Sequence, residues 1–181
     1  MSRRIGVIVG SLRKKAYSLL LAKQVIALLP QGYEGFLVDI SHLPLYNEEF
    51  DETVPPEEYV SFRNEIETYD AFLFVTPEYN RSIPAAIKNA LDVASRPTGQ
   101  NKWAQKPGAV MSVSPGAYGG FGANHHLRQS LMFLDVPLLQ QPEVYLGKVN
   151  TLLKDDGTFI EGTVEFLQQY VDAFIKHINR Y

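Results

Sequence analysis

Short apolar runs alternate with stretches of helical period along this 181-residue chain. The clearest run, Ala71 to Val75, has the length and composition of a strand buried on both faces of a sheet. Similar runs occur at 5–9, 36–38, 108–113 and 138–144, the last bent or bulged near Pro142. Helical stretches are expected at 18–29, 55–69, 84–94, 122–134 and 164–178. The alternation predicts an α/β fold built on a doubly wound parallel sheet.

The expected sheet has five strands in the order 2-1-3-4-5, with helices on both faces. No linker or repeat interrupts the chain, so residues 1–181 are predicted to form a single domain. In such sheets, ligands bind beyond the carboxyl ends of the strands, where the strand order reverses. The loops after the first, third and fourth strands are therefore the places to look for a site.

Composition excludes several classes of protein. The chain has no cysteine, which excludes disulfides, thiolate metal ligands and a cysteine nucleophile, and no other metal-ligand spacing is present. The net charge is −3 with scattered basic residues, so no nucleic-acid partner is expected. The apolar run at 5–9 is too short for a signal peptide, and no run is long enough to span a membrane. A cytoplasmic location is the expectation.

The loop after the first strand, residues 10–18, combines hydroxyl groups with an arginine. Ser11 and Ser18 offer hydroxyl donors, and Arg13 offers a guanidinium that fits phosphate, next to a predicted helix N-terminus. The loop matches neither the Walker A spacing nor the dinucleotide glycine pattern. It therefore predicts a site for a terminal phosphate, as on a mononucleotide. The alternative is a solvated basic loop that only caps a helix.

The loop after the third strand, residues 76–84, has a proline near each end and suits a flat heteroaromatic ligand. Such a ring needs an apolar face and a few donors at its edge. The candidate residues are Pro77, Glu78, Tyr79, Asn80 and Ser82. The alternative is a proline-rich turn in which Ser82 caps the following helix, and Ser82 is able to fill both roles.

The loop after the fourth strand contains four glycines in seven residues, from Gly116 to Gly122. Glycines allow the backbone to approach a ligand and to present N–H groups to negative charge on it. The candidates in this loop are Ser114, Gly116, Tyr118 and Gly119. The alternative is a flexible turn into a helix.

Together these segments resemble the NADPH-dependent FMN reductase family, which includes quinone, chromate and azo-dye reductases. The resemblance runs from the first strand to about Gly147. The matching segments are 10–14, 77–84 with 88–92, and 114–120 followed by 126–129. The resemblance implies a flavodoxin-like fold that holds FMN, usually in a homodimer or homotetramer.

The resemblance also implies roles for individual residues. Ser11, Arg13 and Ser18 take the places that hold the FMN phosphate. The five candidates from Pro77 to Ser82 take the places that line the ring and ribityl chain, and the four from Ser114 to Gly119 fall at the pyrimidine end of the ring. The chain departs from the family at Ala16, where a serine is common, at Ser18, where an asparagine is common, and at Gly122, where many relatives carry an arginine.

The expected activity is hydride transfer from NADPH or NADH through FMN to a small-molecule acceptor such as a quinone, flavin or azo compound, by ping-pong kinetics. No catalytic side chain is required because the cofactor carries the chemistry. The first alternative is a flavodoxin-like electron carrier that does not react with NAD(P)H, although the mild net charge of −3 lacks the strongly acidic surface of such carriers. The second is a non-enzymatic domain that binds another phosphate.

Other conspicuous residues are expected to serve structure rather than chemistry. We expect His125 and His126 to pack at a subunit interface or cap locally rather than to donate protons, and His42 and His177 to lie on the surface. Core or interface packing is expected of Trp103, Phe50 and Tyr46, rather than a rim over the ring. The acids Glu48, Glu49, Asp51 and Glu52 are expected in a solvated loop.

Overall fold

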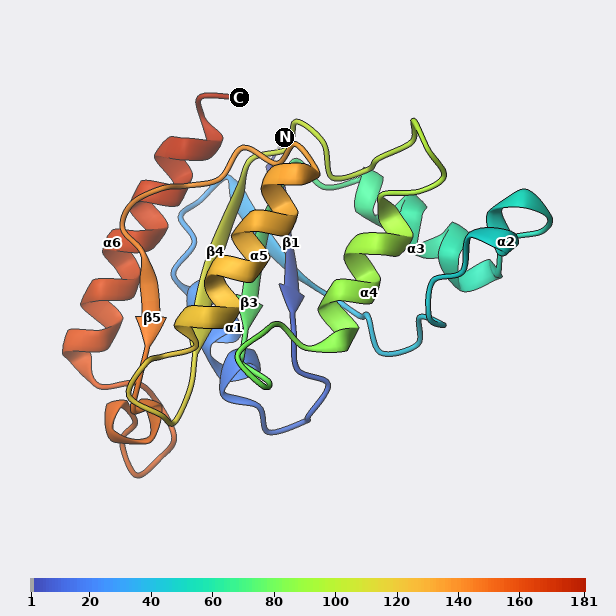
Figure 1. Ribbon diagram of the computed structural model, residues 1–181. Helices are drawn as coiled ribbons and strands as arrows, with labels where there is room; N and C mark the ends of the chain where they lie inside the picture. Colours follow the sequence, from blue (N-terminus) through green and yellow to red (C-terminus); the bar gives the residue numbers. More distant parts are fainter. Residues whose placement is uncertain (1) are drawn as a thin grey trace.

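The computed structural model describes residues 2–181, which form a five-stranded sheet in the order β2-β1-β3-β4-β5 (Figure 1). All four strand pairings are parallel. The strands are β1 Arg3–Val9, β2 Tyr33–Val38, β3 Ala71–Thr76, β4 Gly108–Val113 and β5 Val144–Leu146. The predicted fold class and strand order are confirmed.

Helices cover both faces of the sheet (Figure 1). On one face lie α1 Tyr17–Ala27 and α6 Glu161–Ile178, and on the other lie α3 Glu57–Glu67, α4 Ala85–Ala94 and α5 Phe121–Phe133. A short 3₁₀ helix, η1 Val149–Leu152, follows β5. The five helices that pack on the sheet lie within a few residues of their predicted positions, because the apolar stripe of each helix is visible in its own sequence. The helix η1 was not predicted.

The central strands supply both hydrophobic cores. Every residue of β3 and β4 is buried, and alternate side chains point to opposite faces. Leu73 packs toward α1 and α6, whereas Phe72 and Phe74 pack toward α3 to α5 around Trp103. The Trp103 indole is fully buried and donates a hydrogen bond to the Leu91 carbonyl at 3.1 Å, which confirms its expected packing role.

The fifth strand begins later than predicted. Leu138 forms only an isolated bridge to Gly108, and regular pairing with β4 resumes at Val144. Pro142 lies between them and has no N–H to donate to a ladder, so the run from 138 to 144 cannot form one continuous strand. The prediction of a bend near Pro142 was correct, but most of the predicted strand, residues 138–143, precedes β5 and is not part of it.

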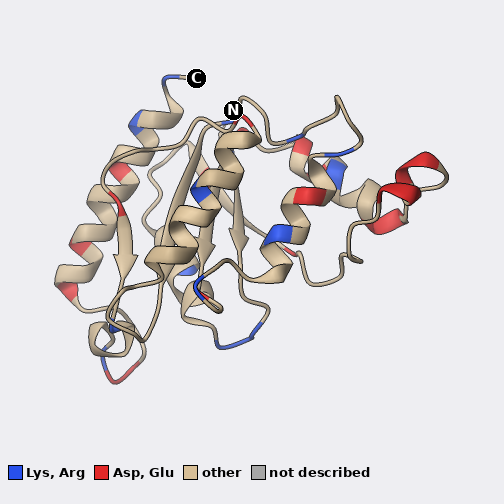
Figure 2. Cartoon of the chain, viewed as in Figure 1, with Lys and Arg blue, Asp and Glu red and all other residues tan. Residues whose placement is uncertain are grey.

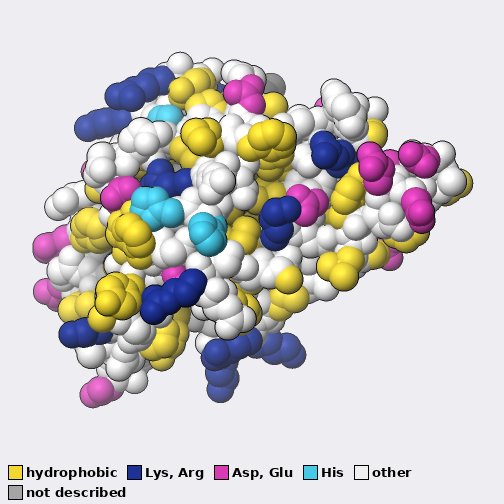
Figure 3. All heavy atoms as spheres, viewed as in Figure 1, with side chains coloured by type: hydrophobic (Ala, Val, Ile, Leu, Met, Phe, Trp, Pro, Cys, Tyr) yellow, Lys and Arg dark blue, Asp and Glu magenta, His cyan; other side chains and the backbone are white. Residues whose placement is uncertain are grey.

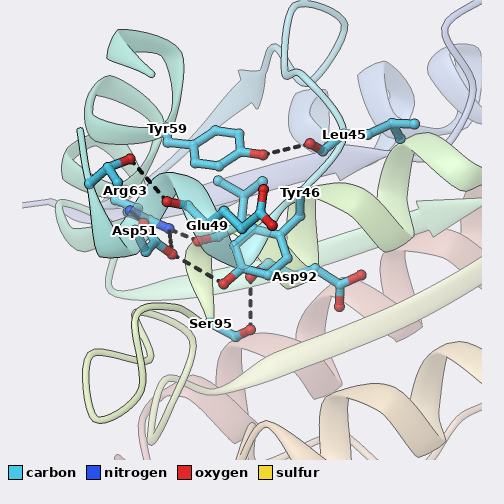
Figure 4. A network of polar contacts seen from close by, with 10 residues as sticks. Leu45, Tyr46, Glu49, Asp51, Tyr59, Arg63, Asp92 and Ser95 are labelled. Atoms are coloured by element: carbon cyan, nitrogen blue, oxygen red, sulfur yellow. Dashed lines mark hydrogen bonds and ion pairs between the residues drawn. The ribbon is translucent and has the colours of Figure 1, made fainter. Parts of the chain in front are cut away.

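The segment expected to be a solvated acidic loop contains a short helix, α2 Glu48–Glu52, capped by the Asn47 side chain. The expectation is wrong for Asp51, whose carboxylate accepts two hydrogen bonds from Arg63 at 2.7 and 2.8 Å (Figure 4). Both side chains are less than 10% exposed. Glu48, Glu49 and Glu52 are exposed, and they form the acidic tip that projects from the body in Figure 2.

His177 is buried rather than exposed, contrary to expectation, with 6% of its surface accessible. It lies three residues after Phe174 and seven after Tyr170, on the stripe of α6 that faces the sheet. Its Nε2 lies 2.8 Å from the Pro137 carbonyl. His42 is exposed, as predicted.

Candidate functional site

The loops that follow β1, β3 and β4 meet at one edge of the sheet, at the bottom of the view in Figure 1. Parallel strands bring their carboxyl ends to the same edge. Gly10 allows the first two loops to close on each other, because a Cβ there would lie 3.1 Å from the Thr76 hydroxyl and 3.2 Å from the Pro77 ring. The Gly10 N–H also donates to the Val75 carbonyl at 2.9 Å.

A cavity of about 280 Å³ lies between these loops. Seven of the twelve predicted site residues line it: Ser11, Arg13, Ser18, Pro77, Glu78, Tyr79 and Ser114. Ala16, Tyr17, Val113 and Pro115 complete the lining. Tyr17 and Val113 were not predicted, although each adjoins a predicted residue at a helix start or a strand end. The structure therefore brings all three loops to one cavity.

The cavity end formed by the first loop has unused donors. The Ser18 side chain is 1% exposed, and its hydroxyl has no hydrogen-bond partner. The N-terminus of α1 is not capped by any side chain, because the capping position is Ala16. Arg13 is exposed on the same loop, in the basic segment at the bottom of Figure 2. A buried hydroxyl and an uncapped helix N-terminus together fit a phosphate group, so this end fits the phosphate of FMN.

The second loop forms a tight turn. Tyr79 and Ser82 exchange two backbone hydrogen bonds of 2.9 Å, and Asn80 and Arg81 adopt positive φ values of 50° and 65°. Asparagine tolerates this left-handed conformation better than most residues, so Asn80 serves the turn. Its side chain is exposed and lies outside the cavity lining, while Tyr79 lines the cavity.

Ser82 lies outside the cavity and lines a larger groove of about 780 Å³ between α4 and α5. Its hydroxyl lies 3.0 Å from Nδ1 of His126 on α5. The alternative reading of Ser82 as a helix cap is wrong, because α4 begins after Pro84 without any side-chain cap. The local capping considered for His126 is instead a contact between the second loop and α5.

The remaining three predicted residues of the third loop lie outside the cavity lining. Gly119 has a φ of 59°, and a Cβ there would lie 2.5 Å from the carbonyl carbon of Tyr145, so it is a structural glycine. The Gly116 N–H already donates to the Ser114 hydroxyl at 3.0 Å. Tyr118 is 71% exposed, with the Arg81 guanidinium 5.5 Å from its ring centre.

Histidine and hydrophobic side chains gather on the outer face of α5 (Figure 3). His125 packs against Phe121, and its Nε2 lies 3.1 Å from the Tyr145 hydroxyl. Burial and the neighbouring Glu143 raise the pKa of Tyr145 to about 12. Tyr145 therefore stays protonated at neutral pH and remains able to donate a hydrogen bond.

Two further features bear on the class of protein. Within residues 2–181, no three side chains of histidine, cysteine, aspartate or glutamate are grouped to hold a metal ion. No helix in the described part of the chain is long and apolar enough to cross a membrane.

The fold and the cavity define a class: a flavodoxin-like domain with a mononucleotide site at the carboxyl edge of its sheet. The chain belongs to the NADPH-dependent FMN reductase family, whose profile matches residues 3–151. Accordingly, it is an NAD(P)H-dependent oxidoreductase with FMN as its cofactor.

Similar proteins cover nearly the whole chain. A quinone reductase of Pseudomonas putida is 54% identical over 170 residues, spanning 94% of this chain and 91% of that protein. A 2-hydroxy-1,4-benzoquinone reductase of Burkholderia sp. is 41% identical, spanning 96% and 95%. The solved structure of FerB, a flavoenzyme NAD(P)H:(acceptor) oxidoreductase from Paracoccus denitrificans, superposes with a TM-score of 0.91 at 39% identity and covers 98% of each chain.

Proposed function

We propose that this chain is a quinone reductase that passes hydride from NADPH or NADH through FMN to quinones, with flavins and azo compounds as further acceptors. The observation that carries the proposal is its similarity to quinone reductases over almost its full length, 54% with the Pseudomonas putida protein. The cavity supports it, because its lining combines donors at one end with Tyr79 and Pro77 at the other.

Two groups of cavity residues would bind different parts of FMN. Ser11, Arg13 and Ser18, with the free N–H groups of α1, would hold the phosphate. Pro77, Tyr79 and Ser114 would line the ribityl chain and ring. When bound, FMN supplies the hydride chemistry. The protein contributes binding, orientation and electrostatics.

The site is open enough for donor and acceptor to use it in turn. Tyr79 lines the cavity and is 49% exposed, so the cavity is open to solvent at this residue. One shared face predicts ping-pong kinetics, in which oxidised nicotinamide leaves before the quinone binds. Double-reciprocal plots for NADPH and a quinone should be parallel. Intersecting plots would contradict this order of events.

The closest rival function is that of an electron carrier. An anaerobic absorbance spectrum of the protein loaded with FMN and desalted, recorded before and after NADPH addition, separates the two. Retained flavin absorbance that bleaches with NADPH or NADH is the expected result. Retained absorbance that neither nucleotide bleaches would identify a flavodoxin-like carrier. No retained flavin would contradict the assignment of the cavity.

We also propose that the chain forms a homodimer or homotetramer and acts in the cytoplasm, the source of its NAD(P)H. Met132 and Phe133 at the end of α5 are 72% and 84% exposed, and Phe133 lines the groove between α4 and α5. Exposed apolar residues grouped in this way are typical of an interface between subunits. Light scattering coupled to size exclusion should give the mass of two or four chains, whereas a monomer would contradict the proposal.

A further inference from the structure

Glu78 joins the loop after β3 to α5, the helix that follows the loop after β4, through a single carboxylate. Its Oε2 accepts a hydrogen bond of 3.1 Å from the backbone N–H of Ala123, in the first turn of α5. The residue at the capping position of α5 is Gly120, which has no side chain to offer. Glu78, 45 residues earlier in the chain, therefore caps α5 from the second loop.

The chain keeps room for this contact. Gly122 lies in the first turn of α5, and a Cβ there would lie 2.8 Å from the Arg81 carbonyl oxygen and 3.0 Å from Oε2 of Glu78. A side chain at position 122 would therefore push the second loop away from α5. The glycine at position 122 thus leaves the space in which the Glu78 carboxylate reaches α5.

The Glu78 carboxylate also lies beside the cofactor cavity. Glu78 is one of the residues that line the cavity, and its side chain is only 13% exposed. Within residues 2–181 its ion-pair partner is Arg81, which is 75% exposed; Nη1 of Arg81 lies 3.5 Å from Oε1 of Glu78, so this pairing is weak. The negative charge of this carboxylate repels any further negative charge that a ligand brings into the cavity. The repulsion is stronger because the carboxylate is largely buried, where the effective dielectric constant is lower than in water.

We propose that Glu78 is a positioning residue of the FMN site that holds the third loop and α5 against the second loop, and that its charge disfavours the reduced form of the cofactor. Reduction adds negative charge to FMN, so the carboxylate lowers the affinity for reduced relative to oxidised FMN. This makes hydride transfer onward to a quinone more favourable. The inference rests on the proposed function. It assigns to Glu78 a role that is exerted through the position of α5 as well as through its place in the cavity lining.

Two substitutions separate the hydrogen bond from the charge. Glu78→Gln keeps an oxygen that can accept from Ala123 and removes the charge, whereas Glu78→Ala removes both. Glu161→Gln, in the first turn of α6 and outside the cavity lining, is the matched control for removing an acid from a helix N-terminus. The readouts are the FMN dissociation constant from flavin fluorescence and the midpoint potential from equilibration with redox dyes.

We expect Glu78→Gln to bind oxidised FMN nearly as tightly as the unsubstituted protein and to favour reduced FMN about tenfold more, a rise of about 30 mV for a two-electron couple. Glu78→Ala should weaken FMN binding about tenfold, because the α5 cap and the loop contact are lost together. Glu161→Gln should change neither quantity. Thermal unfolding of the FMN-free proteins shows whether each variant is folded, and Glu78→Gln, of the same shape, remains informative if Glu78→Ala does not fold.

An unchanged or lowered potential in Glu78→Gln would overturn the role of the charge. Unchanged FMN affinity in a folded Glu78→Ala would overturn the positioning role. Failure of the proposed function looks different, since the unsubstituted protein would then retain no FMN or would not be reduced by NAD(P)H.

Discussion

Ser18 is buried and its hydroxyl hydrogen bonds to nothing in the described chain. An unsatisfied buried hydroxyl lowers stability by about 1–3 kcal/mol, so a side chain of this kind at a cavity wall fits a role in binding a ligand oxygen. Ala16, two residues earlier, offers no hydroxyl, which leaves Ser18 as the buried hydroxyl donor at this end of the cavity. Removing the Ser18 hydroxyl should therefore weaken FMN binding while leaving the stability of the FMN-free protein unchanged or higher.

We predict that Ser18→Ala weakens FMN binding roughly tenfold or more, because a hydrogen bond to a charged group contributes about 1.5–3 kcal/mol. The FMN-free variant should be at least as stable as the unsubstituted protein, since an unpaired buried hydroxyl is removed. FMN titration and urea unfolding measure the two effects, and Ser130→Ala on the outer part of α5 is the control. A destabilised variant with unchanged FMN affinity would show that the hydroxyl serves the fold.

At the scale of elements, the segment containing α2 is held to the body by buried polar contacts (Figure 4). Arg63 on α3 donates two hydrogen bonds to Asp51 and a third, from Nε, to the Val93 carbonyl of α4 at 2.9 Å. Tyr59 donates to the Leu45 carbonyl at 2.7 Å. The segment is therefore an anchored part of the fold although its acidic tip projects into solvent.

We predict that Arg63→Met lowers the free energy of unfolding by about 3–5 kcal/mol, because the Asp51 carboxylate would remain buried without its cationic partner. The matched control is Lys88→Met, which breaks the exposed Lys88–Asp92 pair on α4 and should cost at most about 1 kcal/mol. Urea unfolding gives both values. If Arg63→Met cost no more than Lys88→Met, the network would be incidental to stability.

At the scale of the whole molecule, two cores on opposite faces of one sheet bury tyrosine hydroxyl groups. Burial, together with Glu65, raises the pKa of Tyr69, and burial raises that of Tyr170, whose hydroxyl donates to the Val110 carbonyl at 3.1 Å. Burial first and Glu143 second raise the pKa of Tyr145 from 10 to about 12. The folded state thus retains protons that the unfolded chain releases above pH 10.

Stability should therefore be constant with respect to these tyrosines below pH 10 and should fall as the pH rises from 10 through 12. Tyr145→Phe removes one of the retained protons, so the decline in this interval should be shallower than in the unsubstituted protein. Urea midpoints measured across the interval, with the exposed Tyr181→Phe as control, test this. Equal slopes in the two variants would contradict the assigned shift.

The sequence by itself determined the order of the elements and the edge at which the site lies. Runs such as 71–75 and 108–113 form strands because burial on both faces demands continuous apolar residues, and that demand is local. The parallel topology then placed the three loops together, so seven of the twelve predicted residues line the cavity. The helix at 48–52 also had a local signal that the prediction overlooked, since Asn47 precedes two glutamates.

Only the tertiary structure decided what depends on distant partners. Glu78 contacts Ala123, which lies 45 positions away in the chain, and Asp51 contacts Arg63, 12 positions away. Ser82 contacts His126, 44 positions away. Gly119 is required because β5 passes close behind it, which no local pattern reveals. A polar side chain satisfies its hydrogen bonds with whichever group the packing brings near, so its residue type is readable from sequence while its partner, and hence its role, is set by the fold.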